Sequence, residues 1–298
     1  MAGEPRAWLV GAAGMLGRQM AAAFGSMGLP FLASDREVDI RSPEQLEAFS
    51  RGRAIDWIVN CAAYTAVDRA EDEPDAAFAV NAAGTENLAR LAARLGAKLV
   101  HFSTDYVFAG DRSAPYREED PPRPLSVYGR SKLEGEQRLA ACLRRFFLFR
   151  VSWLYGVHGA NFVRAMLRVF REQDRARVVD DQFGSPTYAA VLAANVAGLV
   201  ASGSERFGVY HYCDAGVLSW HQFARAIQEQ ALRDGTIARE IPIEAVTTAA
   251  YGARAPRPAR ALLDSGRAQR DLGFAVRPWR ANLEEFFREK ARLEGARP

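Results

Sequence analysis

Short apolar runs alternate with longer amphipathic stretches through the first half of the chain. The runs predict buried strands at residues 7–10, 31–33, 57–59, 98–102 and 146–149. The stretches between them predict helices at residues 18–24, from Pro43 onward, at 75–94 and at 127–142. Strands that alternate with helices are typical of a parallel sheet covered on both faces. The pattern therefore predicts an α/β fold with a doubly wound parallel sheet.

The pattern changes after Arg150, where glycine- and proline-bearing loops join the elements. Helices are predicted at residues 162–170, 188–200 and 220–231, with strand-like pieces at 177–179 and 209–212. This half predicts a smaller, mainly helical α/β lobe that packs against the sheet and forms a cleft. We place the sheet domain in residues 1–152, together with 174–208, and the smaller lobe in 153–298, so that the two interleave along the chain.

The composition of the chain indicates its cellular compartment and excludes some classes of partner. The chain has 298 residues, with 39 basic and 36 acidic side chains scattered among one another, so no nucleic-acid footprint is expected. Its three cysteines lie far apart without CxxC spacing, which favours neither disulfides nor zinc and indicates the cytoplasm. The apolar run that follows Met1–Arg6 ends at Gly11, too soon for a signal peptide. No apolar stretch approaches the roughly 20 residues of a membrane span, so no membrane is expected.

A glycine motif follows the first predicted strand and opens the first helix. Gly11, Gly14 and Gly17 fit GxxGxxG, in which glycines permit a tight turn and let a pyrophosphate approach the helix N-terminus. The motif indicates a dinucleotide-binding domain. After the second strand a carboxylate accepts from a ribose hydroxyl, whereas an arginine binds a 2′-phosphate. Here Asp35 is followed at once by Arg36, so the choice between NADH and NADPH stays open.

Tyr128 and Lys132 form the second motif, YxxxK. Lys132 is one of three lysines in a chain that otherwise takes its positive charge from arginine. Four residues make about one helical turn, so both side chains share one helix face. An ammonium near a phenol lowers the tyrosine pKa, and such a tyrosine can donate a proton to a developing alkoxide. The alternative is a tyrosine stacked on the stem of a solvent-facing lysine.

Ser103 and Thr104 lie where the fourth predicted strand ends. The carboxyl ends of parallel strands bind the ligands of such sheets, so Thr104 can face the same cleft as Tyr128. Its hydroxyl would then hydrogen-bond a carbonyl that is being reduced. The alternative is a satisfied turn without a function.

Five stretches together resemble a known family. They are residues 60–68 (NCAAYTAVD), 103–108 (STDYVF), 128–132 (YGRSK), 150–156 (RVSWLYG) and 181–187 (DQFGSPT). In this order they are similar to the extended short-chain dehydrogenase/reductase family, and closest to its branch that reduces dTDP-4-keto-6-deoxyhexoses. The resemblance covers nearly the whole chain. It implies a Rossmann-like sheet, NADPH or NADH as cofactor and a small-molecule nucleotide sugar as substrate.

The resemblance also assigns residues to roles. It implies reduction of a C4 keto group, most closely that of dTDP-4-dehydro-L-rhamnose to dTDP-L-rhamnose. Its catalytic set is Thr104, Tyr128 and Lys132. Its cofactor residues are Gly11, Gly14, Met15, Leu16 and Gly17 at the pyrophosphate, Asp35 and Arg36 at the ribose, Asp39 and Ile40 near the adenine, and Ala62, Ala63 and Tyr64 along the trough, besides Tyr128 and Lys132. Its substrate residues are Thr104, Asp105, Tyr128 and Trp153. The alternatives are a core position for Trp153 and a turn position for Asp105.

The chain departs from the family pattern in one loop. The family often carries Asn-Ser where this chain has Arg260 and Ala261, so recognition of the diphosphate is open, and Arg260 can itself pair with phosphate oxygens. Some members dimerise around a magnesium ion held by glutamates. Met15 begins the helix where such a glutamate would lie, so no metal is expected, and a homodimer is left open.

Two other functions fit the same motifs. A sugar-nucleotide epimerase or dehydratase uses the same three catalytic residues with tightly held NAD, and Asp105 occupies the place of a dehydratase's extra acid. A dinucleotide-binding regulatory subunit without activity is the second alternative. The intact set of Thr104, Tyr128 and Lys132 argues against it.

Overall fold

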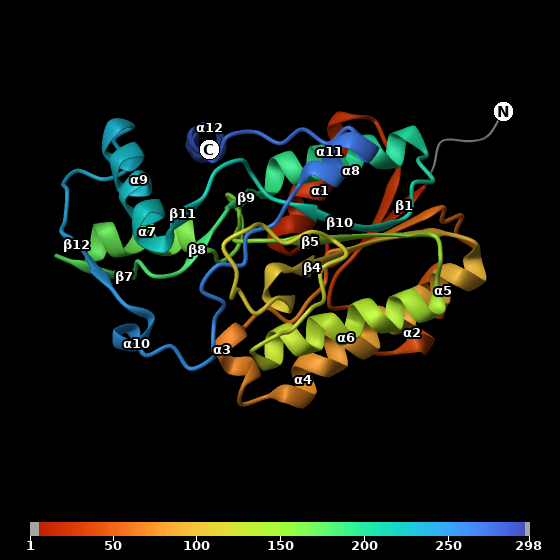
Figure 1. Ribbon diagram of the computed structural model, residues 1–298. Helices are drawn as coiled ribbons and strands as arrows, with labels where there is room; N and C mark the ends of the chain where they lie inside the picture. Colours follow the sequence, from red (N-terminus) through yellow and green to blue (C-terminus); the bar gives the residue numbers. More distant parts are fainter. Residues whose placement is uncertain (1–5, 296–298) are drawn as a thin grey trace.

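Six parallel strands form the central sheet (Figure 1), in the order β10-β5-β4-β3-β1-β2. Their bounds are β1 Ala7–Val10, β2 Phe31–Ser34, β3 Trp57–Asn60, β4 Lys98–Thr104, β5 Phe146–Val151 and β10 Gly208–Tyr212. The predicted α/β fold class is therefore confirmed. The computed structural model describes residues 6–295, which include the apolar run at residues 7–10 but not the five residues before Arg6.

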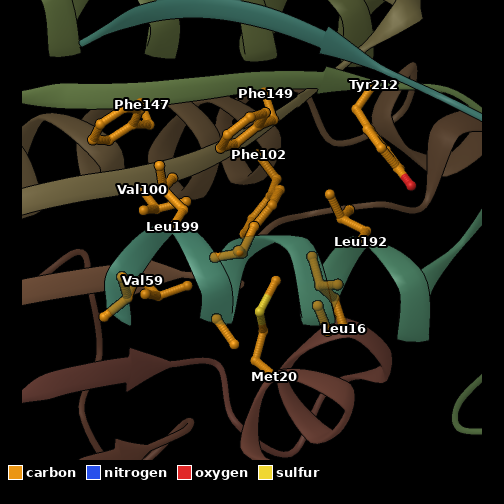
Figure 2. Packing of buried hydrophobic residues seen from close by; sticks show 14 of the residues in the cluster. Leu16, Met20, Val59, Val100, Phe102, Phe147, Phe149, Leu192, Leu199 and Tyr212 are labelled. Atoms are coloured by element: carbon orange, nitrogen blue, oxygen red, sulfur yellow. The ribbon is translucent and has the colours of Figure 1, made fainter. Parts of the chain in front are cut away.

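Helices cover both faces of the sheet (Figure 1). On one face lie α1 (Met15–Ser26), α8 (Ala189–Ser202) and α11 (Gly266–Leu272), and on the other α2 (Pro43–Ser50), α5 (Thr85–Leu95) and α6 (Val127–Cys142). Successive side chains of a strand point to opposite faces. Leu9 of β1 accordingly belongs to the apolar cluster with Met20 of α1, and Trp8 to the cluster with Leu88 of α5. Figure 2 shows the first cluster, where α1 and α8 pack against the sheet.

The helix predicted at residues 75–94 contains a π-helical segment. The chain runs as α4 (Pro74–Phe78), a π-helix η1 (Ala79–Gly84) and then α5, with a short α3 (Val67–Ala70) before them. Asn81 is buried in the π-helical turn. Such turns are rare and frequently lie at functional sites.

The smaller lobe collects most of the remaining elements, to the left in Figure 1. Its apolar core joins side chains of α7 (Phe162–Glu172), α9 (Trp220–Arg233) and α12 (Trp279–Gly295). Three two-stranded pairs accompany them: β6 (Leu154–Tyr155) with β9 (Thr187–Tyr188), β7 (Ala176–Val179) with β12 (Ile243–Val246), and β8 (Phe183–Gly184) with β11 (Leu218–Ser219). A short α10 (Thr248–Tyr251) follows β12. Among residues 6–295 no helix is both long and apolar enough to cross a membrane.

The domain boundary stays a prediction, and strand pairing bears on where to draw it. β10 is the edge strand of the large sheet, and α8 packs on that sheet, whereas β7 pairs with β12. We propose that α8 and β10 belong to the sheet domain and that β7 belongs to the smaller lobe. This moves the boundary predicted at residues 174–208 without changing the interleaving.

Candidate active site

The glycine turn between β1 and α1 leaves no room for side chains. Gly11 has φ +74°, and a Cβ there would lie 2.7 Å from the backbone nitrogen of Ala62. A Cβ on Gly17 would lie 2.1 Å from the carbonyl oxygen of Gly11. α1 begins at Met15 without a side-chain cap and without an acidic residue in its first turn. The turn therefore fits a pyrophosphate, which would meet free N–H groups and the positive end of the helix dipole.

The residues expected at the adenosine lie just after β2. The Asp35 backbone N–H donates to the Glu37 carboxylate at 2.7 Å. Asp39 accepts from Arg41 at 2.6 Å, and that hydrogen bond holds the pKa of Asp39 below its usual range. Ile40 is buried in the core on the α5 side of the sheet. Asp35 thus directly follows β2 and Asp39 lies four residues further along the chain, whereas the Ile40 side chain is packed in the core.

Asn81 ties the expected cofactor trough to α6. Its side-chain oxygen accepts the Tyr64 N–H at 2.9 Å, and its amide nitrogen lies 3.0 Å from both the Tyr64 carbonyl and the Ser131 hydroxyl. The backbone N–H of Ala62, at the start of the trough, donates to the Asn60 side chain at 3.0 Å. Sequence reasoning did not find Asn81. An asparagine inside the apolar run at residues 76–84 was the available signal.

Thr104 ends β4 and starts a short 3₁₀ turn, η2 (Asp105–Val107). Its hydroxyl accepts the Tyr106 N–H at 3.2 Å and donates to the Asp105 carboxylate at 3.0 Å. Asp105 is buried, and burial raises its pKa to about 7. A carboxyl group that can hold a proton near neutral pH therefore lies beside the Thr104 hydroxyl.

Tyr128 reaches this threonine from the first turn of α6. Ser126 caps the helix by accepting the Gly129 N–H at 3.1 Å. A Cβ on Gly129 would lie 2.3 Å from the Tyr106 carbonyl oxygen, so only glycine lets α6 approach η2 this closely. The Tyr128 hydroxyl comes within hydrogen-bonding reach of Thr104. The structure thus brings together Thr104, Asp105 and Tyr128.

The predicted lowering of the Tyr128 pKa by Lys132 is wrong. Burial raises the pKa of Tyr128 to about 12, and its hydrogen bond with Thr104 offsets the rise only in part. Lys132 does not lower the pKa of Tyr128, because its side chain is directed to the backbone of β4. Its Nζ donates to the carbonyl oxygen of Phe102 at 2.6 Å, near the end of β4.

Lys132 lies inside the protein and does not face solvent. Its exposed fraction is 2%, which excludes the solvent-facing alternative. Besides the Phe102 carbonyl, its Nζ lies 3.4 Å from Nε2 of the buried His101. Burial lowers the pKa of Lys132 to about 8. Sequence reasoning did not find His101, although a histidine in an apolar strand two residues before the Ser-Thr pair was visible.

Trp153 has a strained backbone and a tightly packed ring. Its φ is +46°, and among residues 6–295 no other residue except glycine has a positive φ. Its indole stacks on Trp220 with ring centroids 3.5 Å apart. A Cβ on Gly184 would lie 2.4 Å from that indole. Strain of this kind often marks a functional position.

The loop at residues 254–260 carries three arginines, and they differ in the groups that they contact. Arg254 pairs with Asp72, and Arg257 pairs with Asp68 at 2.7 Å. Arg260 has no carboxylate partner among the described residues, and its Nε is buried without a hydrogen-bond partner. Its guanidinium lies over the Phe183 ring, 4.9 Å from the centroid, next to Gly184.

The arginine loop also reaches the strand end that carries Thr104. The Arg260 N–H donates to the carbonyl oxygen of Gly110 at 3.1 Å, and Gly110 follows Thr104 by six residues.

The expectation that the protein holds no metal ion stays a prediction. Within residues 6–295 no group of three or more His, Cys, Asp or Glu side chains is arranged to hold a metal ion.

Comparisons with known proteins agree on one family. The family profile "RmlD substrate binding domain" matches residues 6–292. The spore coat polysaccharide biosynthesis protein SpsK of Bacillus subtilis is 38% identical over 95% of this chain and 97% of its own length. The dTDP-4-dehydrorhamnose reductase of Aggregatibacter actinomycetemcomitans is 37% identical over 94% of this chain and 97% of its own length.

A solved structure is similar over the same length. The dTDP-4-dehydrorhamnose reductase of Bacillus anthracis in complex with NADP superposes with a TM-score of 0.89 at 36% identity, covering 96% of this chain and 99% of its own. The expected resemblance to the extended short-chain dehydrogenase/reductases is thereby confirmed. The chain belongs to the RmlD substrate binding domain family.

Proposed function

We propose that this protein uses NAD(P)H to reduce the C4 keto group of a dTDP-4-keto-6-deoxyhexose, converting dTDP-4-dehydro-L-rhamnose to dTDP-L-rhamnose. The observation that carries the proposal is the meeting of Thr104 and Tyr128 at the carboxyl end of β4, with Lys132 buried behind them. Relatives that are 34–37% identical over more than nine tenths of this chain bear the name of that reductase, which supports the same substrate here.

The nicotinamide, when bound, supplies the hydride that adds to C4 of the sugar. Tyr128 then donates its hydroxyl proton to the oxygen on C4, so that the carbonyl becomes an alcohol. Burial keeps the pKa of Tyr128 at about 12, so this proton stays on the phenol until a more basic alkoxide develops. The Thr104 hydroxyl holds the same oxygen by a hydrogen bond and so aims it at Tyr128.

Other side chains of the chain hold the two ligands. The glycine turn and the uncapped start of α1 would bind the pyrophosphate of the dinucleotide, and Lys132 the ribose hydroxyls near the nicotinamide. On the substrate side, Trp153 would form a wall for the sugar. Arg260, which lacks a carboxylate partner in the described chain, would pair with the diphosphate.

The test is an assay of purified protein with dTDP-4-dehydro-L-rhamnose and either NADPH or NADH. The proposal expects one reduced cofactor to be consumed per sugar, and the product to carry the C4 configuration of L-rhamnose. Absence of cofactor oxidation with this sugar and with its C4 stereoisomers would refute the reductase. Running both cofactors also shows which one the pair Asp35 and Arg36 prefers.

A dehydratase is the second candidate, because of one carboxyl group. Asp105 is buried beside Thr104, and its pKa of about 7 gives it a proton to donate near neutral pH. This is where a dehydratase would carry its acid. Turnover of a nucleotide sugar without added cofactor would favour the dehydratase, and net consumption of NAD(P)H the reductase.

We also propose a cytoplasmic location, supported by three cysteines that are all unpaired. A homodimer stays open, and no metal ion is expected at the interface of such a dimer. Sedimentation with and without a chelator tests both statements. A dimer that dissociates when divalent ions are removed would contradict the metal-free interface.

A further inference from the structure

A buried chain of polar groups leads from the cofactor trough to Lys132. Asn60 of β3 lies opposite His101 of β4 in the parallel register, and both are about 1% exposed. The Asn60 amide nitrogen lies 3.1 Å from Nδ1 of His101. The other ring nitrogen, Nε2, lies 3.4 Å from Nζ of Lys132. Neither Asn60 nor His101 has a role in the proposed hydride transfer.

The hydrogen bonds fix which nitrogen of His101 carries the proton. The Asn60 side-chain oxygen accepts the Ala62 N–H at 3.0 Å, so the amide nitrogen must be the group that faces His101. An amide nitrogen only donates, and Nδ1 must therefore accept. A neutral imidazole with an accepting Nδ1 carries its proton on Nε2. His101 consequently presents an N–H donor to Lys132.

A donor on His101 has a consequence for Lys132. An ammonium has three donors and no acceptor, so two donors would face each other across 3.4 Å. An uncharged amine, by contrast, accepts from Nε2–H and still donates to the Phe102 carbonyl at 2.6 Å. The amine form satisfies every polar contact at this position, and the ammonium form does not.

We propose that at pH 9 Asn60 and His101 hold Lys132 as an uncharged amine in the cofactor-free protein, and that Lys132 takes up one proton from solvent when NAD(P)H or NADP⁺ is bound. His101 is a positioning residue in this account. The proposal rests on the cofactor assigned under the proposed function, because ribose hydroxyl oxygens are the acceptors that would favour the ammonium.

The other charged groups around Lys132 do not reverse this preference. On α6 itself lie Tyr128, which stays neutral, and Glu136, which favours the ammonium. Glu136 is already engaged by Arg150 of β5 at 2.7 Å. On β4 the facing group is His101, whose own pKa burial holds well below its usual value. Burial likewise lowers the pKa of Lys132, to about 8.

Calorimetric titration with NADP⁺ at pH 9, in two buffers of different ionisation enthalpy, counts the protons taken up on binding. At this pH a phosphate monoester with a second pKa of about 6 no longer titrates. Asp105 and Asp214, each with a pKa of about 7, are ionised, while Tyr128 is still protonated. The wild type should take up nearly one proton per site, and its Kd for NADP⁺ should weaken about tenfold per pH unit above pH 8.

Two variants test the cause. Asn60→Asp turns the facing group into an acceptor, which moves the imidazole proton to Nδ1 and lets Nε2 accept from an ammonium. His101→Phe removes the N–H without adding charge. Each should reduce the proton uptake to less than half of the wild-type value. The control His221→Phe removes a histidine that contacts the Ile243 carbonyl in the smaller lobe, and should leave the uptake unchanged.

The outcomes separate this inference from the proposed function. Uptake below about 0.2 proton in the wild type, or full uptake in Asn60→Asp and in any folded His101→Phe, would overturn the inference while the reductase assay stands. If His101→Phe does not fold, Asn60→Asp decides. A wild type that binds neither NADP⁺ nor NAD⁺ would overturn the proposed function, and this inference with it.

Discussion

Replacing Glu136 with glutamine should destabilise the protein strongly, because it leaves a buried arginine without a counter-charge. The side chains of Glu136 and Arg150 are 6% and 5% exposed. Arg150 donates to the two carboxylate oxygens at 2.7, 3.1 and 3.2 Å, and Ser103 donates to the same carboxylate. Ser103 precedes Thr104, so this pair also supports the strand end at the site.

The size of the loss in stability follows from which interactions of the Glu136 carboxylate a glutamine amide can still make. Its amide has one oxygen, so at least one of the charge-assisted hydrogen bonds is lost, at about 1.5–3 kcal/mol. The guanidinium also loses its counter-charge in a buried setting, and breaking such a pair costs about 3–5 kcal/mol in total. We expect the free energy of unfolding to fall by about that amount.

Urea unfolding followed by far-UV circular dichroism measures the change. The control is Glu229→Gln, whose partner Arg233 lies one turn away with both side chains about 60% exposed, and it should cost less than about 0.5 kcal/mol. Adding Arg150→Met to Glu136→Gln should restore much of the loss. A loss below about 1 kcal/mol for Glu136→Gln, or costs that simply add in the double variant, would refute the reasoning.

Three further predictions follow from the site. Gly17→Ala should weaken NADP⁺ binding at least tenfold, because its Cβ would lie 2.1 Å from the Gly11 carbonyl oxygen. In the control Gly25→Ala, in the same helix, the added Cβ meets nothing within 4 Å and NADP⁺ should bind normally, so equal affinities of the two variants would contradict the close-packed turn. Asp105→Asn should gain stability relative to wild type as pH rises from about 4 to 7. The raised folded-state pKa of Asp105 means that the carboxyl group stabilises the wild type at low pH and loses this contribution through that window. A difference in the free energy of unfolding that stays constant with pH in urea unfolding would contradict this prediction. Arg260→Ala should weaken dTDP binding about tenfold while NADP⁺ binding holds, and unchanged dTDP affinity would remove Arg260 from the diphosphate site.

The sequence predicted the sheet well because its signals are local. A buried parallel strand is a short apolar run, and a helix that follows it has its own period, so the six strands and α6 were predicted within a few residues. Residues 183–184 and 218–219 carried no such signal. They form β8 and β11, which exist only through pairing across the smaller lobe. Local pattern cannot predict pairs of that length.

The motif residues were predicted, but their electrostatics were not. The spacing of four residues places Tyr128 and Lys132 on one helix face, but it does not predict how deeply the two side chains are buried. Burial sets both pKa values, raising the pKa of Tyr128 and lowering that of Lys132. Asn81 and His101 were missed for a related reason, since their roles come from contacts across 17 and 31 residues of chain. Such contacts are visible only once the strands and helices are placed.

The initial rate of NAD(P)H oxidation with dTDP-4-dehydro-L-rhamnose, compared between wild type and Tyr128→Phe, tests the central claim most directly. Phenylalanine keeps the ring against Tyr106 and removes only the hydroxyl that hands over the proton. We expect the rate at saturating cofactor to fall by about 10²–10⁴. A Tyr128→Phe variant that reduces the keto sugar at the wild-type rate would contradict the assignment of Tyr128 as the acid.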